Sequence, residues 1–472
     1  MKIRNRLRNF NHKLMNKLCL LSVSLLVLCA CTSKKKDTIK IAKKPNVLFI
    51  SIDDLNDWVE PLGGHPQAIT PNLEEFAKRA MTFTNAHASA PLCNPSRVSI
   101  MTGLDPRNTG IVSNNAFYPF RKYLPDAETM IQHFKKEGYY TAGFGKVFHK
   151  EDSKTEPWDE YAWCSGRPKP TPYPGHGIKF ITDSVYRYFD WGAVADSISK
   201  WGENQITQKV DEFFKKSHES PFFLAAGFRL PHLGWYTPPR FHKLYDSLDI
   251  QLPDFSHDDI KDVPAIILES VKKDRRAHDT IMGRGVWQDA VKSYLASVSY
   301  IDYELGRIME KLKSSSYYEN TIVIVWSDHG FHLGEKSTWR KNTLWEESTR
   351  VPLLIHAPEV TKLGAKTDHP VSLLDLYPTL VSLCGITPRD DLDGQNISEL
   401  LSDPETKLDK DYVTTTNVLG TAIRNKNWRY IQYKDGSEEL YDHRTDPLEH
   451  INLIGNSDYL DQLNKLRSYL SK

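Results

Sequence analysis

A cysteine at the start of an expected helix is the residue of this chain best placed to do chemistry. It opens the run Cys93-Asn94-Pro95-Ser96-Arg97, which continues to Thr102-Gly103. Pro95 fits the first turn of a helix, where its missing N–H costs nothing. The free N–H groups of that helix end would face an anion over Cys93, and Arg97 would lie one turn further along the same face, within reach of the cysteine and the anion. The pattern predicts a nucleophile for an anionic substrate, and a buried, inert cysteine is the alternative.

Acidic residues follow two apolar runs of strand length. The run 46–52 leads into Asp53-Asp54, and the run 321–326 leads through Ser327 into Asp328-His329. Sites in α/β folds form at the carboxyl ends of the strands, where these side chains would lie. Crowded carboxylates repel one another unless a cation lies among them, and such oxygen ligands prefer Ca²⁺ or Mg²⁺. Together with the cysteine run they predict a metal site, although either pair alone would suit a capping or turn role.

The cysteine run resembles the signature of the type I sulfatases, whose core is Cys-x-Pro-Ser/Ala-Arg with a closing Thr-Gly. Residues 138–149 (Gly-Tyr-Tyr-Thr-Ala-Gly-Phe-Gly-Lys-Val-Phe-His) resemble the second signature of that family. The Gly-Lys-Val-Phe-His ending is most similar to the iduronate-2-sulfatase branch. Asn94 departs from the small residue more common in the family. The resemblance extends over nearly all the chain after the leader and implies hydrolysis of sulfate esters.

The resemblance implies a modified nucleophile and one calcium ion. Cys93 would be oxidised to formylglycine by a maturation enzyme, either the formylglycine-generating or the anaerobic type, and the hydrated aldehyde would attack sulfur. A single Ca²⁺ would be bound by Asp53, Asp54, Asp328, His329 and an oxygen of the modified Cys93. The histidine in the last place is again the pattern of the iduronate-2-sulfatase branch.

The resemblance also implies residues that bind the sulfate group and move protons. Arg97, Lys146 and Lys341 would neutralise negative charge. His149 would be the base that releases sulfate, and His232 would contact sulfate and donate a proton to the leaving alcohol. The alternative for each histidine is an ordinary core or surface residue, since the chain has 17 of them, and Lys341 lies in a charged stretch where a solvated lysine is common. His332 is a weaker candidate for touching the substrate ring.

Strand patterns alternating with helical ones predict an α/β fold with helices on both faces of the sheet. Helical patterns cover 71–80, 127–137, 204–216 and 289–312. The resemblance implies the alkaline phosphatase/sulfatase-like architecture, a large mixed sheet between helices, as a catalytic domain over 45–385. Residues 386–472 would form a C-terminal subdomain with strands at 412–417, 421–424, 429–433 and 438–441 and a closing helix at 457–470.

The first residues have the pattern of a bacterial lipoprotein leader. A basic region precedes an apolar run at 18–30 that is too short to span a bilayer, and Leu28-Cys29-Ala30-Cys31 resembles a lipobox. The pattern predicts a signal peptide at 1–31, lipid attachment at Cys31 and a tether at 32–44. The protein would lie in the cell envelope, periplasmic or at the outer membrane, with no other membrane contact. Cleavage to a soluble periplasmic protein is the alternative, and Met15 is an alternative start to Met1.

Charge and cysteine content narrow the function classes. Lys and Arg number 61 and Asp and Glu 60, for a net charge of +1 over 472 residues. With no global positive field and no basic block beyond the leader, nucleic-acid binding is not expected. Outside the leader and the motif, only Cys164 and Cys384 remain, and two isolated thiols are favoured over a disulfide between them.

The expected substrate is a sulfated oligosaccharide in polysaccharide breakdown. Resemblance to iduronate-2-sulfatases implies a sugar with a carboxylate near the ester, as in glycosaminoglycans or algal ulvan. Aromatic segments at 157–174 and 234–239, including Tyr161, Trp163, Trp235 and Tyr236, could form a rim that stacks on sugars. Two other functions are open: a phosphonate or phosphate ester hydrolase of the same superfamily, and a non-catalytic carbohydrate-binding lipoprotein, which the intact cysteine motif disfavours.

Overall fold

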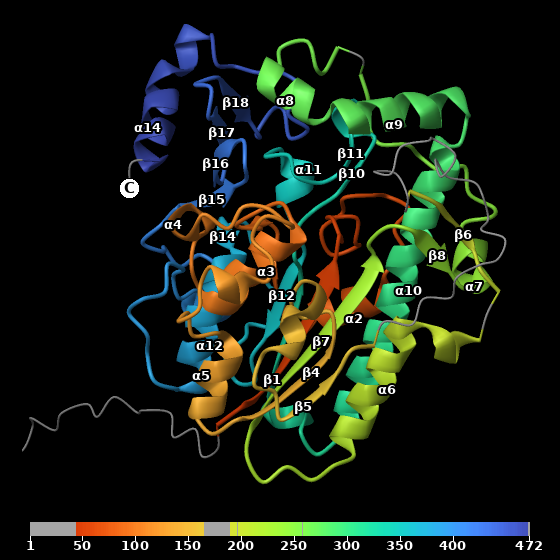
Figure 1. Cartoon of the computed structure of the whole chain (residues 1–472), viewed down its shortest axis with the longest axis vertical. Helices are drawn as coiled ribbons and strands as arrows, with labels where there is room; N and C mark the ends of the chain where they lie inside the picture. The colour runs from red at the N-terminus through yellow and green to blue at the C-terminus, as the bar shows by residue number, and fades with distance from the viewer. Residues whose placement is uncertain (1–43, 165–188, 196, 257, 471–472) are drawn as a thin grey trace, which may run out of the picture. The chain divides into compact units, whose positions relative to one another are not determined.

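The computed structural model describes residues 44–164, 189–195, 197–256 and 258–470. The described residues from Pro45 onward form one compact unit, drawn in Figure 1. The predicted signal peptide, the lipid-bearing cysteine and the predicted tether up to residue 43 lie outside the described residues, as do residues 165–174 of the aromatic rim. No helix among the described residues is both long enough and apolar enough to cross a membrane.

A mixed sheet of eight strands forms the centre, in the order β13-β2-β12-β9-β1-β7-β4-β5. Strand β1 is parallel to β7 and β9, β4 is parallel to β7 and β5, and β12 runs antiparallel to β9. The central strands are continuous apolar runs because both faces are covered. The bounds are β1 (Asn46–Asp53), β2 (Met81–Phe83), β4 (Tyr140–Gly145), β5 (Glu160–Ala162), β7 (Phe222–Pro231), β9 (Thr321–Ser327), β12 (Leu353–His356) and β13 (Lys366–Thr367).

Helices cover both faces of this sheet, which confirms the predicted α/β class (Figure 1). Alternate residues of β1 point to opposite faces: Leu48 and Ile50 belong to one buried cluster, Val47 and Phe49 to the other. The first cluster includes residues of α2 (Pro71–Ala77), α6 (Gly202–Phe214) and α10 (Trp287–Lys313). The second includes residues of α3 (Cys93–Thr102), α5 (Met130–Lys136) and α12 (Leu376–Cys384).

A small antiparallel sheet follows, as predicted, in the order β15-β16-β17-β18. Its strands are β15 (Tyr412–Thr416), β16 (Gly420–Asn425), β17 (Trp428–Tyr433) and β18 (Glu438–Asp442). Helix α14 (Leu460–Leu470) packs on one face, where Leu463 and Leu466 meet Tyr430. On the other face, Ile431 and Tyr441 pack with Trp345. The antiparallel sheet is therefore joined by buried contacts to the segment just after Lys341.

Short elements connect these layers. They are β3 (Ala86–His87), β6 (Trp191–Ala193), β8 (Trp235–Thr237), β10 (His332–Leu333), β11 (Trp339–Arg340), β14 (Val371–Ser372), α4 (Pro106–Thr109), α7 (Pro239–Lys243), α8 (Ala265–Ser270), α9 (Lys272–Gly283), α11 (Glu346–Thr349) and α13 (Ser398–Ser402). The predicted helix at 127–137 begins only at Met130, because Thr129 and Gln132 form a capping box there.

Two expectations about single side chains have clear outcomes. No disulfide joins Cys164 and Cys384, as favoured from the sequence. The prediction that Trp235 could stack on a sugar is wrong. Its side chain is fully buried and its indole N–H donates to the Pro231 carbonyl at 2.7 Å, so it belongs to the core.

Candidate active site

The carboxyl ends of the central strands bring the predicted site residues to one edge of the sheet. Asp53 ends β1, Asp328 follows β9, Lys146 follows β4 and His232 follows β7. Strands β9, β1, β7 and β4 are consecutive neighbours in the sheet. Residues from four distant parts of the sequence therefore meet at this edge.

Helix α3 adds the cysteine to this edge. Cys93 is the first helical residue and Pro95 lies in the first turn, as predicted. The Cys93 Sγ lies 3.2 Å from His329 Nε2 and 4.0 Å from Asp54 Oδ1. Burial and Asp53 raise the pKa of the Cys93 thiol. Lys146, Lys341 and His329 lower it by more, so the net shift is downward. The site thus stabilises the thiolate more than water does around an ordinary cysteine.

Four of the five predicted metal ligands form a compact group. Candidate ligand atoms of Asp53, Asp54, Cys93 and His329 all lie within 4.8 Å of one another. Asp328 is not in that group, although its Oδ1 is 3.6 Å from His329 Nε2. His329 Nδ1 lies 2.9 Å from the Gly330 carbonyl. With a proton on Nδ1, the ring donates to that carbonyl, and Nε2 lies 3.4 Å from Asp54 Oδ1. Burial lowers the pKa of His329, but Asp328 and Cys93 raise it to about 9, so Nε2 must lose its proton before it can bind a cation.

The donors in this group suit a divalent cation. Asp53 Oδ1 and Asp54 Oδ2 are buried and accept no hydrogen bond from any described residue. Burial, with Asp53 beside it, raises the pKa of Asp54 to about 7 despite Lys341. Such buried, crowded carboxylates are stabilised by a bound cation. Carboxylate oxygens are the usual ligands of Ca²⁺ and Mg²⁺, and here two of them accept no hydrogen bond from described residues. The imidazole of His329 would be an additional ligand.

Arg97 ties the strand ends together. Its guanidinium is fully buried, and Nε donates to Asp328 Oδ2 at 2.7 Å. Nη1 donates to the carbonyls of Lys146 and Val147 at 2.6 and 3.0 Å, and Nη2 lies 3.6 Å from Asp53 Oδ1. Arg97 therefore binds carboxylates, main-chain carbonyls and the Ser51 hydroxyl, and it occupies the Asp328 carboxylate.

Two lysines stand over the carboxylates. Lys146 Nζ donates to Asp53 Oδ2 at 2.5 Å, and Lys341 Nζ donates to Asp54 Oδ1. Burial lowers the pKa of Lys341, but Asp54 and Cys93 raise it by more, so the net shift is upward. Their side chains keep 9% and 12% of their surface exposed, whereas the carboxylates are fully buried. The lysines thus lie between the buried ligands and solvent, where an anionic group would arrive.

The two predicted proton-transfer histidines are neutral in this environment. Burial and Lys146 lower the pKa of His149 to about 3. Burial and Lys341 lower the pKa of His232 well below its usual value. His232 Nδ1 lies 2.8 Å from the Leu233 carbonyl, which fixes the ring. A neutral imidazole offers the unprotonated nitrogen that the role predicted for His149 requires, but a pKa of about 3 makes it a weak base. Both histidines would need a nearby negative charge before they could hold a proton.

Other residues support the site without having been predicted. Tyr294 of α10 donates its hydroxyl to the Asp54 carbonyl at 2.9 Å, and no sequence signal marked it. Ser96 donates to the Asp328 carbonyl at 2.5 Å and could have been found, because it lies inside the cysteine motif. His332 does not contact solvent: it is fully buried against Thr343, so the prediction that it touches substrate is wrong.

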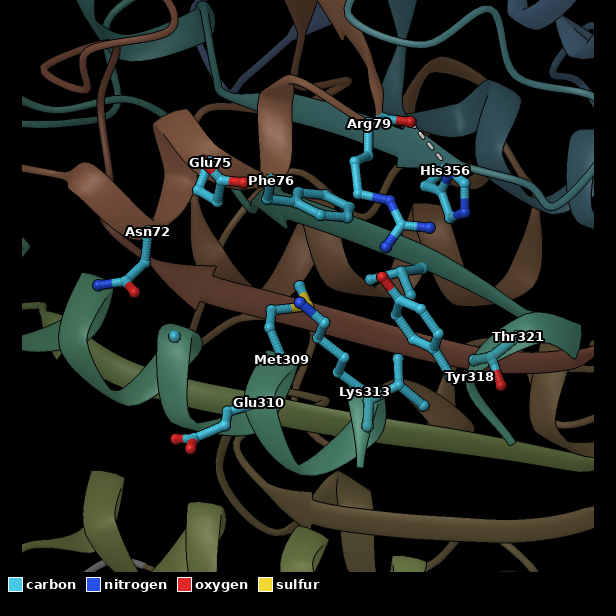
Figure 2. A pocket seen from close by; sticks show the side chains of 13 residues that line it. Asn72, Glu75, Phe76, Arg79, Met309, Glu310, Lys313, Tyr318, Thr321 and His356 are labelled. Atoms are coloured by element: carbon cyan, nitrogen blue, oxygen red, sulfur yellow. Dashed lines mark hydrogen bonds between the residues drawn. The ribbon is translucent and has the colours of Figure 1, made fainter. Parts of the chain in front are cut away.

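A separate cavity of about 290 Å³ lies away from these residues. Figure 2 shows its lining, with Phe76, Met309, Tyr318 and the His356–Arg79 hydrogen bond. Thr321, the first residue of β9, also lines it, so the cavity lies toward the amino end of the strand whose carboxyl end precedes Asp328. None of the predicted site residues lines this cavity.

Comparison with known proteins identifies the family. The family model described as sulfatase matches residues 45–386, and the model described as N-sulphoglucosamine sulphohydrolase, C-terminal, matches residues 334–472. The chain is 37% identical over 467 residues to a protein named sulfatase from Formosa agariphila, covering 96% of this chain and 91% of that one. It is 27% identical over 523 residues to iduronate 2-sulfatase of Mus musculus, covering 89% and 93%.

The fold is also found in a solved structure of another ester hydrolase. A solved structure of a phosphonate monoester hydrolase from Silicibacter pomeroyi superposes with a TM-score of 0.73 at 20% identity, covering 90% of this chain and 94% of that one. The architecture is thus the one shared by sulfatases and alkaline-phosphatase-like hydrolases. Within it, the chain belongs to the sulfatase family and is a sulfuric ester hydrolase, as the two signatures predicted.

Proposed function

We propose that this protein hydrolyses sulfate esters on uronate-containing oligosaccharides, using a formylglycine made from Cys93 and one Ca²⁺. The observation that carries the proposal is the meeting of Cys93 with Asp53, Asp54 and His329 at a helix N-terminus, beneath two lysines. This arrangement combines a nucleophile position, a cation site and positive charge for an anion. Each of these is what sulfate-ester hydrolysis requires.

Calcium is the cation that we propose for the ligand group. Asp53, Asp54, His329 and an oxygen of the modified Cys93 would hold it, with Asp328 as a further ligand once its Oδ1 faces the ion. When bound, Ca²⁺ supplies Lewis-acid charge and orients the sulfuryl oxygens. The buried carboxylate oxygens that accept no hydrogen bond from described residues support this assignment.

The proposed modification exchanges the sulfur of Cys93 for an aldehyde oxygen. Its hydrate supplies two hydroxyls, one to attack sulfur and one to release sulfate afterward. We assign the second role to His149, whose unprotonated nitrogen would take the proton of that hydroxyl once the negative charge of the bound sulfate raises its pKa from about 3. A maturation enzyme of the formylglycine-generating or anaerobic type must act on Cys93 first, before the buried residue is enclosed by the fold.

The lysines and His232 would act on the sulfate ester itself. Lys146 and Lys341 now pair with Asp53 and Asp54, and with calcium on those carboxylates their charge becomes available to sulfate oxygens. The negative charge of a bound ester would raise the pKa of His232, which allows it to protonate the leaving alcohol. The proton from His232 would neutralise the negative charge that develops on the leaving oxygen in the transition state.

The substrate class is inferred from the second signature and from the relatives. The Gly145–His149 sequence has the iduronate-2-sulfatase form, and the mouse relative carries that name. The net charge of +1 gives no general attraction for polyanions, so local cations must select the substrate. Glycosaminoglycans and ulvan both offer a carboxylate near a sulfate ester.

One panel experiment tests this proposal. Matured enzyme is incubated with glycosaminoglycan, ulvan, fucoidan and carrageenan oligosaccharides, and released sulfate is measured. Release from the uronate-containing members is expected. Release only from carboxylate-free galactans would refute the uronate class, and no release from any sulfate ester would refute the reaction.

A phosphonate or phosphate ester hydrolase is the second candidate, favoured by the structural likeness to a phosphonate monoester hydrolase. That likeness, at 20% identity, concerns the fold alone. Parallel assays with aryl sulfate, aryl phosphate and phosphonate monoesters separate the two, and we expect sulfate esters to be the better substrates. Because many polysaccharide sulfatases ignore aryl esters, the oligosaccharide panel is run beside them.

We also propose that the protein is held in the cell envelope by a lipid on Cys31. The lipobox-like sequence before that residue supports the assignment. Metabolic labelling with a radioactive fatty acid should mark the wild type and leave the Cys31→Ser variant unlabelled. Equal labelling of both chains contradicts the anchor.

A further inference from the structure

The main chain around Lys341 has an unusual conformation. Arg340 and Asn342, on either side of the lysine, have φ angles of 74° and 81°. Asparagine adopts this left-handed region more often than most residues, but arginine seldom does and keeps it where surrounding contacts hold it. Lys341 therefore depends on groups that fix its neighbours.

Hydrogen bonds hold the main chain of Asn342, the residue after Lys341, at both its N–H and its carbonyl. The N–H of Asn342 donates to the Pro91 carbonyl at 3.1 Å, two residues before Cys93. The carbonyl of Asn342 accepts a hydrogen bond from Asn417 Nδ2 at 2.8 Å. Asn417 is 2% exposed, so water cannot readily replace that donor. A side chain of the C-terminal sheet thus holds the residue next to Lys341.

Asn417 also belongs to the turn that follows β15. Its Oδ1 accepts hydrogen bonds from the N–H groups of Leu419 and Gly420 at 2.8 and 3.2 Å. Just before it, the Thr415 hydroxyl donates to the Ala88 carbonyl at 2.6 Å and the Thr416 N–H donates to the Ser89 carbonyl at 2.9 Å. The end of β15 therefore contacts the segment before Cys93 and the segment of Lys341 together.

We propose that Asn417 is a positioning residue of the active site, which holds Lys341 in place through the Asn342 peptide. The C-terminal sheet then completes the site, although none of its residues touches the reacting atoms. The assignment of Lys341 to sulfate binding rests on the proposed function. The positioning itself rests only on the hydrogen bonds and backbone angles described above. A small displacement of such a charge is costly, because it must meet the transition state at a fixed position.

The test uses Asn417→Asp and a matched control, Asn425→Asp. The aspartate at 417 keeps the oxygen that caps the turn but replaces the donor to Asn342 with an acceptor that repels its carbonyl. Asn425 caps the next turn in the same way, accepting from Asn427 and Trp428 at 3.0 and 2.8 Å. It pairs with Tyr412, at the other end of β15 from Thr416.

Two readouts are measured on matured full-length enzyme. The first is inhibition by inorganic sulfate, with kcat and KM on the panel substrate that is hydrolysed. The second is the rate of acetylation of Lys341 by acetic anhydride, followed by peptide mass spectrometry. Asn417→Asp should weaken sulfate inhibition and lower kcat/KM by about tenfold or more. In this variant, acetic anhydride should acetylate Lys341 several-fold faster than in the wild type. Asn425→Asp should match the wild type in both, with a similar melting temperature to Asn417→Asp.

Equal sulfate inhibition and equal Lys341 acetylation in the two variants would overturn the inference. If Asn417→Asp does not fold, Asn417→Ser takes its place, because its hydroxyl can still cap the turn but is too short to reach Asn342. If the wild type neither releases nor binds sulfate, the proposed function fails, and the acetylation contrast still decides whether Asn417 positions Lys341.

Discussion

Two buried clusters in the described part of the chain contain the same kinds of side chain but are compensated differently. One is the group of Asp53, Asp54, Cys93 and His329 at the edge of the large sheet. The other is Glu346, His443 and Glu449, where α11 meets the C-terminal sheet. Both have the composition of a metal site, so composition alone does not separate them.

The second cluster is closed by arginines. Arg429 is fully buried and forms ion pairs with Glu346 and, at 2.5 Å, with Glu449. Arg424 adds an ion pair to Glu346 at 3.1 Å. Burial raises the pKa of Glu346, but Arg424, His443 and Arg429 lower it by more, so that it lies well below its usual value. These carboxylates already have fixed counter-charges, and the cluster serves to hold the two parts of the fold together.

The first cluster is covered by lysines, which are flexible and reach solvent. It retains carboxylate oxygens that accept no hydrogen bond from described residues, and the pKa of Asp54 is raised to about 7 instead of being lowered. Two arginines satisfy the carboxylates of the second cluster, whereas in the first cluster Arg97 and the lysines leave one oxygen of Asp53 and one of Asp54 without a hydrogen bond from described residues. The contrast shows that carboxylate oxygens left without a hydrogen bond, more than the types of ligand, distinguish the candidate binding site from the structural cluster.

The largest expected effect is at the nucleophile of the first cluster. Cys93→Ala should abolish sulfate release, because no other residue supplies the attacking oxygen. The same variant should still bind Ca²⁺ through its carboxylates. In the wild type, peptide mass spectrometry should show the mass change from thiol to aldehyde at Cys93 after maturation. Full activity in Cys93→Ala, or in an enzyme whose Cys93 remains a thiol, would falsify the assignment.

Removing one metal ligand or the cation itself should lower turnover nearly as much as removing the nucleophile. Chelation, or Asp54→Asn, should lower turnover by about 10³-fold or more, because Lewis-acid charge is worth several kcal/mol. The fold should survive, since the asparagine removes a carboxylate that burial disfavours. Metal content by mass spectrometry and the melting temperature are measured together. Glu346→Gln is the control and should keep its calcium; chelated enzyme with full activity contradicts the metal site.

A substitution in the second cluster should lower the free energy of unfolding of the protein. Glu346→Gln leaves two buried arginines without full compensation and should cost about 3–5 kcal/mol in the free energy of unfolding. Urea unfolding measures this loss. Glu269→Gln removes an exposed ion pair with Lys272 and should change stability by about 0–1 kcal/mol. Equal losses in the two variants would show that the buried cluster has no special role.

The smallest effect is the pH dependence of that loss. The pKa of Glu346 is lower in the folded protein, so its stabilisation is complete above the ordinary value of 4.5 and fades as pH falls toward the folded value. The difference in unfolding free energy between wild type and Glu346→Gln should therefore shrink below that pH and stay constant above it. A difference that grew on acidification would reverse the sign of the argument.

Much of the active site was predictable because its residues follow local patterns. Asp53-Asp54 and Asp328-His329 come directly after apolar runs, and parallel strands place such residues at one edge. Cys93 and Lys146 lie inside short signatures. The pairing of Asp328 with Arg97 was not predicted, since a motif shows which residues are present but not which one each guanidinium contacts. Trp235 misled for a related reason: an aromatic residue after a turn fits a rim and a core equally.

The sequence by itself determined the central strands and the family and indicated the candidate nucleophile and ligand groups, because period, apolar run length and short motifs are local properties. Only the tertiary structure decided which charges compensate which, and how Lys341 is held. Asn417 lies 76 positions beyond that lysine, and Tyr294 lies 240 residues from Asp54. Their hydrogen bonds exist because the fold buries them together, where an unpaired donor or acceptor would be costly.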